Sequence, residues 1–503
     1  MAAQEYDVVV IGAGPAGENV AARTVKGGLR TAIVESELVG GECSYWACIP
    51  SKALLRPLEV WNAARSIAGA REGMASKPNA AAILARRDSF TNNWHDSGQV
   101  EWLRGAGIDL VRGHGRISGD RRISVEAPDG TSTELTVRHA VAVCTGTRAA
   151  IPPIPGLREA RPWTSREATA SKEAPRRLVI LGGGVVACEM ATAWLQLGTE
   201  EATFLLRGQS LLPNYEECAR ESVRKSLVKL GAKLITGVSA KAVERLDDGS
   251  VRVSLPSGEF IDADQVLVAT GREPRTDDLG LESVGLKSRS WLEVDETMRV
   301  DGISGGWLYA VGDVNHRALL THMGKYQARV CGEVICARAR GHFDAKSAGE
   351  WSRFAASADH HAVPQVVFTD PEVAAVGLSA DQARKRGLDV RVVDYDIGNV
   401  AGATLYADGY EGCARMVVDN ARNIVVGVTL VGPAVGEMIH AATIAVAGAV
   451  PIDRLRHAVP AFPTISEVWL RLLEALDEQL IVQPSPENSR AGKKSSEVRD
   501  LSR

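Results

Sequence analysis

The sequence lacks the features of a membrane-spanning, secreted or nucleic-acid-binding chain. Its 503 residues contain no apolar run close to the roughly 20 residues that cross a bilayer. No basic segment followed by an apolar one opens the chain, so a secretory signal is not expected. The net charge of −4 gives no reason to expect nucleic-acid binding. We therefore expect a cytoplasmic protein that acts on a small molecule, with no membrane or nucleic-acid partner.

Cysteine is too sparse for a disulfide-stabilised scaffold, since only 8 occur in 503 residues. Cys43 and Cys48 nevertheless lie close together in the run GGECSYWACIPSK at residues 40–52. Such a pair suggests a redox-active disulfide; unrelated buried cysteines or half of a zinc site are the alternatives. No second Cys/His pair at zinc-ligand spacing follows, which favours the redox interpretation and predicts no metal site. The scattered cysteines are expected to be reduced core or surface residues: Cys144, Cys188, Cys218, Cys331, Cys336 and Cys413.

A glycine-rich turn near the N-terminus predicts a dinucleotide site. An apolar strand is expected at residues 6–11, followed by the turn and an alanine-rich helix. Gly12 permits the tight bend, Gly14 lets the backbone approach a pyrophosphate, and Gly17 allows close packing of helix on strand. Glu35 ends the next predicted strand, where a carboxylate can accept hydrogen bonds from ribose hydroxyls. A turn without a ligand is the alternative, but the strand–turn–helix context favours nucleotide binding.

A second copy of this pattern follows the predicted strand at residues 178–181. Gly182 and Gly184 precede Ala187, which is the small third residue, so the chain should hold two nucleotides. Arg207 stands where an NAD site would place an acid. A guanidinium can bind the 2′-phosphate that a carboxylate would repel, so NADPH is the expected donor and NADH the other candidate. The alternative is that Arg207 is a solvated surface residue.

The segment with Cys43 and Cys48 resembles the redox helix of the flavoprotein disulfide reductases, the pyridine nucleotide-disulfide oxidoreductases of class I. Members of this family include dihydrolipoamide dehydrogenase, glutathione reductase and mercuric reductase. The resemblance extends over about residues 5–480 and implies an α/β fold with two Rossmann-like dinucleotide-binding domains. It also implies a C-terminal α+β dimerisation domain and a homodimer. Within that last domain, a strand is expected at 423–430 and a helix at 437–449.

The resemblance also implies domain boundaries. It places the FAD-binding domain at residues 1–150 with a second part at 272–350, and the NAD(P)-binding domain at 151–271. The dimerisation domain follows at 351–482. Residues 483–503 are rich in Pro, Ser, Lys and Arg, so a disordered tail is expected. Contacts to FAD are implied for Gly12, Gly14, Gly17, Glu35, Lys52, Thr145, Gly146 and Asp313. Contacts to NAD(P) are implied for Gly182, Gly184, Ala187, Glu189, Arg207 and Gly271.

The family's catalytic parts map onto a few further positions. Cys48 corresponds to the thiolate beside the flavin and Cys43 to the thiol that exchanges with the acceptor. Lys52 and Glu189 correspond to an ion pair beside the flavin, where a cation favours the reduced ring. Glu42 replaces the threonine of the family's Gly-Gly-Thr-Cys pattern and puts a carboxylate near the flavin diphosphate.

The family's general base is missing. It is a His in the pattern His-Pro-Thr-x-x-Glu, but the matching string here begins with Phe462 and ends with Glu467. A positioned imidazole contributes roughly 10²–10⁴-fold to proton transfer, and phenylalanine contributes nothing of that kind. His457 can in principle substitute, although a solvated or capping histidine is the favoured interpretation. Without the imidazole, Glu467 is expected to serve structure, and Phe462 to form an apolar wall of the substrate pocket.

The sequence thus predicts an FAD-dependent oxidoreductase that passes electrons from NAD(P)H through flavin and the Cys43–Cys48 disulfide to an acceptor. The expected acceptor is a disulfide or dithiol of the dihydrolipoamide dehydrogenase type. Reduction of a quinone or related electrophile is the first alternative, because Phe462 cannot handle protons. A flavin-binding redox sensor without turnover is the second, which the intact dithiol argues against. Mercuric reduction is disfavoured, because no cysteine follows Cys413.

Overall fold

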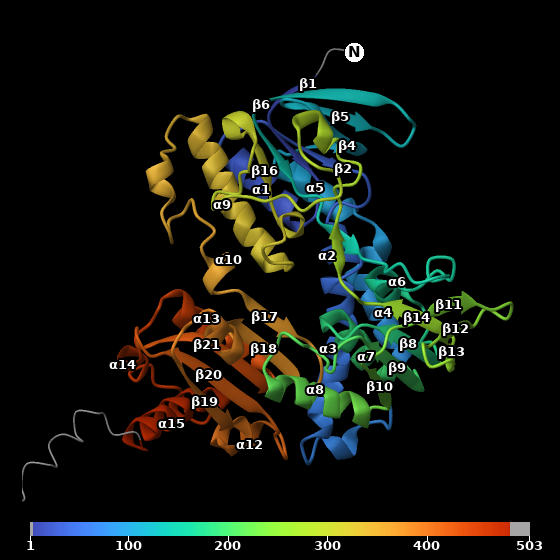
Figure 1. Ribbon diagram of the computed structural model, residues 1–503, viewed down its shortest axis with the longest axis vertical. Helices are drawn as coiled ribbons and strands as arrows, with labels where there is room; N and C mark the ends of the chain where they lie inside the picture. Colours follow the sequence, from blue (N-terminus) through green and yellow to red (C-terminus); the bar gives the residue numbers. More distant parts are fainter. Residues whose placement is uncertain (1–3, 483–503) are drawn as a thin grey trace, which may run out of the picture.

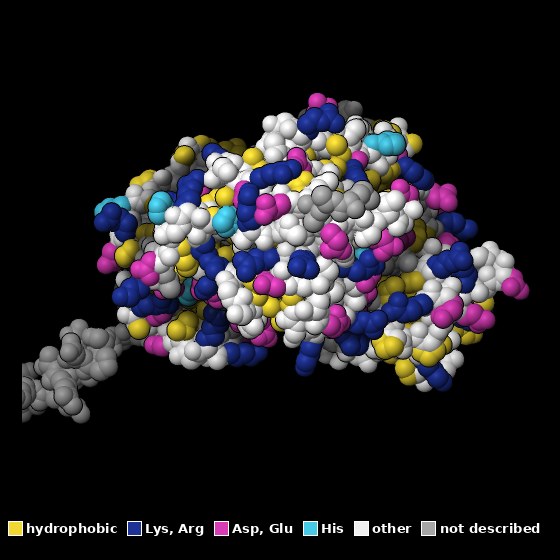
Figure 2. All heavy atoms as spheres, turned by 90° about the horizontal axis from the view of Figure 1, so that it is seen from above, with side chains coloured by type: hydrophobic (Ala, Val, Ile, Leu, Met, Phe, Trp, Pro, Cys, Tyr) yellow, Lys and Arg dark blue, Asp and Glu magenta, His cyan; other side chains and the backbone are white. Residues whose placement is uncertain are grey.

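Three lobes make up the molecule, and each contains one large sheet (Figure 1). The computed structural model describes residues 4–482, so the tail expected at 483–503 lies outside the described residues. None of the helices in the described part is both long and apolar enough to span a bilayer. Lys and Arg alternate with Asp and Glu over the face seen in Figure 2, as the near-neutral composition predicts.

The first lobe holds a seven-stranded sheet in the order β3-β2-β1-β6-β5-β4, with β16 paired to β6. Val8 and Val10 share a core with helices on one face, whereas Val9 and Ile11 face the other side. This alternation buries β1 on both faces, as expected for a parallel central strand. The strands are β1 (Gln4–Ile11), β2 (Thr31–Glu35), β3 (Asp109–Arg112), β4 (His114–Gly119), β5 (Arg122–Glu126), β6 (Ser132–Val143) and β16 (Leu308–Ala310). Its helices are α1 (Pro15–Lys26), α5 (Ser97–Gly105) and α9 (Thr321–Ala339).

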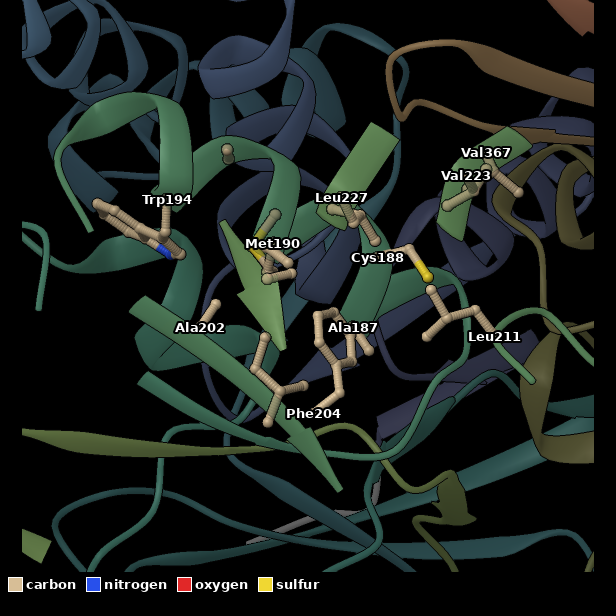
Figure 3. Close-up of a cluster of buried hydrophobic side chains, with 14 of the residues drawn as sticks. Ala187, Cys188, Met190, Trp194, Ala202, Phe204, Leu211, Val223, Leu227 and Val367 are labelled. Atoms are coloured by element: carbon tan, nitrogen blue, oxygen red, sulfur yellow. The ribbon is translucent and has the colours of Figure 1, made fainter. Parts of the chain in front are cut away.

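The second lobe holds a four-stranded parallel sheet in the order β10-β9-β8-β14. Trp194 and Phe204 are fully buried between this sheet and its helices (Figure 3). The parallel strands are β8 (Arg177–Leu181), β9 (Glu201–Leu206), β10 (Ala232–Thr236) and β14 (Gln265–Val268), with helices α6 (Ser165–Ala170), α7 (Val185–Leu197) and α8 (Glu217–Lys229). A small antiparallel sheet beside it contains β11 (Ala242–Arg245), β12 (Val251–Ser254) and β13 (Phe260–Ala263).

Two short antiparallel strands join the first two lobes where the chain crosses between them: β7 (Thr147–Ala149) and β15 (Arg272–Pro274). They directly follow Thr145-Gly146 and Thr270-Gly271, respectively. The long helix α3 (Cys48–Arg65) leaves the first lobe and packs against α7 of the second. Shorter helices nearby are α2 (Gly41–Tyr45) and α4 (Ala80–Phe90).

The third lobe holds a five-stranded antiparallel sheet in the order β17-β18-β21-β20-β19. All nine residues of β21 are buried, because the strand is central and covered on both faces. The strands are β17 (Pro364–Val367), β18 (Glu372–Gly377), β19 (Val390–Asp396), β20 (Cys413–Asp419) and β21 (Ile424–Gly432). The helices are α10 (Ala358–His361), α11 (Ala380–Lys385), α12 (Ala401–Tyr406), α13 (Val435–Ala447), α14 (Ile452–Leu455) and α15 (Val468–Val482).

The elements predicted from periodicity are confirmed. The strands expected at 6–11, 178–181 and 423–430 correspond to β1, β8 and β21. The helix expected at 437–449 corresponds to α13, which begins two residues earlier, at Val435, and ends at Ala447. The α/β fold class with a C-terminal α+β lobe is confirmed as well.

Gly17 gives a stability test of the first glycine-rich turn. Gly17→Ala should lower the free energy of unfolding by about 1–3 kcal/mol, because its Cβ would lie 1.9 Å from the carbonyl oxygen of Gly12. Gly98→Ala in α5 is the matched control, since no described atom lies within 4 Å of a Cβ there. Helix propensity alone predicts that the control gains up to about 1 kcal/mol. Equal shifts of the two variants in thermal unfolding would contradict the packing argument.

Candidate active site

The first glycine-rich turn brings backbone close to backbone and leaves space for a ligand. Gly12 has a φ of +101°, and a Cβ there would lie 2.5 Å from the carbonyl oxygen of Cys144. At Gly14, no atom of the described residues lies within 4 Å of such a Cβ. Glu35 accepts a hydrogen bond from the Ala13 N–H at 2.7 Å, and burial raises the pKa of its carboxyl group. The open side at Gly14 and the N-terminus of α1 together suit a phosphate group.

This turn borders a cavity of about 470 Å³. The Thr145 hydroxyl is buried without a hydrogen-bond partner among the described residues, so a ligand in the cavity can satisfy it. Asp313 accepts a hydrogen bond from the Thr147 hydroxyl at 2.8 Å, and burial raises the pKa of its carboxyl group. These features fit a dinucleotide. The predicted FAD residues that line the cavity are Gly12, Gly14, Glu35, Thr145, Gly146 and Asp313.

The two cysteines lie at adjoining helix ends. Cys43 lies in α2 and lines the cavity, and Cys48 is the first residue of α3, where backbone N–H groups favour a thiolate. Both are free thiols, and Cys48 Sγ lies 3.2 Å from Thr321 Oγ1 at the start of α9. The neighbouring Cys43 thiol lowers the pKa of Cys48 to about 6; Thr321 and Lys52 act in the same direction. The same interaction raises the pKa of Cys43. These opposite shifts favour Cys48 as the thiolate of the pair.

An ion pair between Lys52 and Glu189 lies at the junction of all three lobes. Lys52 Nζ is 2.6 Å from Glu189 Oε2, and the Glu189 side chain is only 4% exposed. The other carboxylate oxygen of Glu189 accepts a hydrogen bond from the backbone N–H of Phe368 at 3.0 Å. Lys52 Nζ also lies 4.7 Å from the centroid of the Phe368 ring. The pair thus fixes the lysine one helical turn beyond Cys48.

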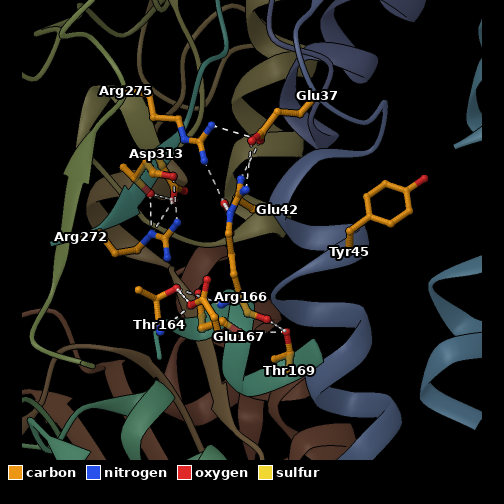
Figure 4. Close-up of polar contacts among 12 residues, drawn as sticks. Glu37, Glu42, Tyr45, Thr164, Arg166, Glu167, Thr169, Arg272, Arg275 and Asp313 are labelled. Carbon is orange, nitrogen blue, oxygen red and sulfur yellow. Dashed lines mark hydrogen bonds and ion pairs between the residues drawn. The ribbon is translucent and has the colours of Figure 1, made fainter. Parts of the chain in front are cut away.

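Glu42 belongs to a charged cluster beside the first cavity (Figure 4). Arg166 Nε lies 2.5 Å and Arg275 Nη2 lies 3.1 Å from Glu42 Oε1, and both arginines also pair with Glu37. The Arg166 guanidinium stacks on the Trp46 ring, 4.1 Å from its centroid. The carboxylate that replaces the family's threonine is therefore neutralised by two cations. Glu42 thus ties α2 to α6, and the stacking of Arg166 on Trp46 ties the segment between the cysteines to the same helix.

The second glycine-rich turn repeats the geometry of the first. Gly182 has a φ of +110°, and a Cβ there would lie 2.4 Å from the carbonyl oxygen of Ala269. Gly184 again faces space that no described atom occupies within 4 Å of a Cβ. Ala187 is fully buried in the first turn of α7. This close approach and open side fit a second dinucleotide.

Arg207 directly follows β9 and is exposed. Within residues 4–482 its guanidinium forms no ion pair. Gly271 has a φ of +140° at the crossing into β15. A cavity of about 470 Å³ beside Gly184 extends between the second and third lobes, where Tyr215 donates a hydrogen bond to Gln365 at 2.9 Å.

The positions around the missing base lie away from the dithiol of the same chain. Phe462 is 77% exposed, and His457 is also exposed. Glu467 is buried and accepts hydrogen bonds from the backbone N–H groups of Thr464 and Gly402, each at 3.1 Å. Neither Phe462, His457 nor Glu467 is among the described residues that line the cavity of Cys43.

Sequence reasoning missed several residues that the fold brings to the site. Thr321 and Phe368 contact Cys48 and Lys52, and Arg166 and Arg275 contact Glu42. No local motif marked them, because each comes from a segment far from residues 40–52. Glu42 was the one available signal of these arginines, because a carboxylate near a diphosphate needs positive charges nearby to balance it.

Comparison with known protein families matches this arrangement of lobes. Residues 6–331 match the family model described as pyridine nucleotide-disulphide oxidoreductase. Residues 363–473 match the dimerisation domain of the same family. These two matches account for the first two lobes and the third lobe, respectively.

Individual relatives are similar over nearly the whole chain. The dihydrolipoyl dehydrogenase of Thermus scotoductus is 33% identical over 486 residues, covering 95% of this chain and 98% of the relative. The mercuric reductase of Staphylococcus aureus is 31% identical over 470 residues, covering 92% of this chain and 81% of the relative. In structure, the Cu(II) complex of the HOCl-induced flavoprotein disulfide reductase RclA from Escherichia coli gives a TM-score of 0.78. It shares 23% identity over 94% of this chain and 99% of that chain, which supports the fold.

The pKa of Cys48 predicts how its reactivity depends on pH. Because this pKa is lowered to about 6, the thiolate persists as the pH falls until about that value. Alkylation of Cys48 in the reduced protein, followed by mass spectrometry over a pH series, should therefore have its midpoint near there. Cys43→Ala removes the largest stabilising contact and should move the midpoint toward the ordinary value of about 8.5. A wild-type midpoint already at that ordinary value would contradict the assignment of the thiolate.

Proposed function

Because this chain belongs to the pyridine nucleotide-disulphide oxidoreductase family, we propose that it uses electrons from NADPH to reduce a lipoamide-type disulfide through Cys43 and Cys48. The family uses FAD and NAD(P)H, and relatives at 30–33% identity include dihydrolipoyl dehydrogenases. FAD, when bound, accepts two electrons from the nicotinamide and delivers them to a disulfide. The observation that carries the proposal is the Cys48 sulfur, which lies at a helix N-terminus 3.2 Å from the Thr321 hydroxyl.

The chain's own residues divide the binding work between the two turns. At the first, the open backbone at Gly14, the Thr145 hydroxyl and the Asp313 carboxyl group are suited to hold FAD. At the second, Gly184 and Arg207 are suited to hold the diphosphate and the 2′-phosphate of NADPH. Each residue is assigned to the part of the cofactor that its charge or hydrogen-bonding capacity suits.

The dithiol performs the exchange with the acceptor. Cys43 attacks one sulfur of the substrate disulfide, so the substrate S–S bond breaks and a mixed disulfide forms. Cys48, as a thiolate, then attacks the Cys43 sulfur, which re-forms the Cys43–Cys48 disulfide and releases the second substrate thiol. The substrate gains two electrons and two protons, and the dithiol loses two electrons. The leaving thiolates therefore need a proton donor.

Reduction of a quinone or related electrophile is a second candidate, and Phe462 is the observation that favours it. The dimerisation domain supports a homodimer. The resemblance to the family implies that its base reaches the dithiol from the other chain. Here the partner subunit's Phe462 would occupy that place and supply an apolar ring instead of a proton. A quinone draws its protons from solvent and can accept electrons without proton delivery at the dithiol.

Phe462→His tests the choice of acceptor. Oxidation of NADPH should be slow with lipoamide in the wild type and faster in the variant, by up to roughly 10²-fold, because a positioned imidazole protonates the leaving thiolate. The panel contains lipoamide, glutathione disulfide and a naphthoquinone. Phe462→Leu is the matched control, since it changes the side chain without adding a base.

The outcomes of this panel separate the two candidates. Fast wild-type lipoamide turnover that the histidine does not improve would contradict the role given to Phe462. Wild-type naphthoquinone turnover that greatly exceeds lipoamide turnover, and that survives Cys43→Ser, would favour the second candidate. No reduction of the bound flavin by NADPH would overturn both.

Arg207→Ala tests the nicotinamide preference. The variant should raise KM for NADPH by roughly tenfold or more, since a charge-assisted hydrogen bond contributes about 1.5–3 kcal/mol. Its kcat/KM with NADH should stay unchanged, because NADH has no 2′-phosphate. Arg224→Ala, at an exposed arginine of α8 in the same lobe, is the control. Equal efficiency of the wild type with NADPH and NADH would refute the preference.

A further inference from the structure

Cys218 and Cys413 form a second pair of thiols at the contact between the second and third lobes. Cys218 lies in the first turn of α8, and Cys413 is the first residue of β20. Both are partly exposed free thiols that pack against the same buried cluster, and each shifts the pKa of the other. The sequence predicted reduced core or surface cysteines at these positions, and both are free thiols here. It did not predict that the fold brings the two segments together.

The alternation of β20 directs Cys413 toward α8. Ala414 and Met416 point into the core of the third lobe, so Cys413 and Arg415 share the opposite face of the strand. Arg415 Nη1 pairs with Glu216 Oε2 at 2.8 Å, directly before α8. This ion pair lies two residues from each cysteine and holds the two segments in register.

The packing behind the thiols is shared by both lobes. Val223 and Leu227 of α8 lie in one buried cluster with Val367 of β17 (Figure 3). Val431, the residue of β21 that pairs with Cys413, belongs to the same cluster, and both cysteines pack against it. The thiols are therefore held together by a core and an ion pair, rather than by a mobile surface contact.

We propose that Cys218 and Cys413 form a reversible interlobe disulfide when the protein meets a hydroperoxide, independently of Cys43 and Cys48. The Cys218 thiolate attacks the peroxide oxygen, the O–O bond breaks, and a sulfenic acid and an alcohol or water result. The Cys413 thiol then attacks the sulfenic sulfur, which forms the S–S bond and releases water. The dithiol loses two electrons in total, and the peroxide gains them.

Charge and position make Cys218 the attacking thiol. Hydrogen bonding to Cys413 lowers the pKa of Cys218, and the Arg415 guanidinium acts in the same direction; burial, Asp394 and Glu216 oppose them. Cys218 also lies near the N-terminus of α8, where backbone N–H groups favour a thiolate. The same interaction raises the pKa of Cys413, so this thiol keeps its proton while Cys218 reacts with the peroxide. When Cys413 attacks the sulfenic sulfur, its proton leaves with the sulfenic hydroxyl group as water.

The disulfide would join two lobes beside the second glycine-rich turn. The cavity of about 470 Å³ next to Gly184 has Tyr215 and Glu216 on one side and Gln365 on the other. Its two sides belong to the lobes that the bond would connect. Oxidation would therefore fix the spacing of the lobes at this cavity, and the cross-link would also raise the melting temperature.

The test uses FAD-loaded protein with Cys43→Ser and Cys48→Ser, which leaves Cys218 and Cys413 as the only partly exposed cysteines among the described residues. One equivalent of hydrogen peroxide should remove two free thiols and yield a single cross-linked peptide that contains Cys218 and Cys413 in a non-reducing digest. Dithiothreitol should reverse both changes. Adding Cys218→Ser should abolish the cross-link and the rise in melting temperature, with FAD content as the measure of folding.

Arg415 supplies an independent test on the otherwise unaltered chain. Arg415→Met should slow the peroxide-driven cross-linking several-fold, whereas Arg415→Lys, which retains the charge, should not. Arg422→Met, at an exposed arginine after β20, is the matched control and should react at the wild-type rate. Free Cys218 and Cys413 after peroxide treatment, or their separate over-oxidation without a cross-linked peptide, would overturn the proposal.

Discussion

One buried carboxylate, that of Glu189, aligns the three lobes at the redox site. It pairs with Lys52 of α3 and accepts a hydrogen bond from the backbone of Phe368 in the third lobe. A carboxylate this deeply buried needs such partners, since removing one partner of a buried pair costs about 3–5 kcal/mol. Because Cys48 and Lys52 lie one turn apart on the same face of α3, the contact that fixes the lysine also fixes the thiolate. The position of the dithiol therefore depends on the packing of all three lobes.

Local rules account for the parts of the site that the sequence predicted. The turns at Gly12 and Gly182 depend on a positive φ, which is a requirement of the turn itself. The backbone that lies close to each glycine comes from a distant segment, at Cys144 and Ala269, but the turn can be recognised without it. The cysteine pair is likewise contained in a single short run. Thr321 and Cys413 were beyond this reasoning, because their roles exist only once distant segments meet. Contacts between lobes join residues that are far apart in the chain, so no motif or spacing in a single sequence predicts them.

The departures from the family pattern differ in how the structure accommodates them. Around the cysteines, Glu42 is balanced by two arginines, and the Trp46 ring stacks under one of them. Tyr45 is held by a hydrogen bond from Trp94 Nε1 to its carbonyl oxygen at 3.1 Å. Glu42 and the two aromatic residues beside it are thus held by contacts within their own chain. Phe462 is instead exposed, so any contact that compensates for it must come from a second subunit or from the substrate.

In the loop that carries Phe462, Glu467 has a structural role that does not depend on proton transfer. In the family this carboxylate orients an imidazole, yet here it is buried and accepts two backbone hydrogen bonds, from Thr464 and Gly402. A buried carboxylate with two such donors has a structural role that needs no imidazole. The loop that carries Phe462 is therefore shaped by Glu467 whichever side chain stands at position 462. The supporting fold therefore does not depend on an imidazole at position 462, and the effect that we propose for phenylalanine is confined to the choice of acceptor.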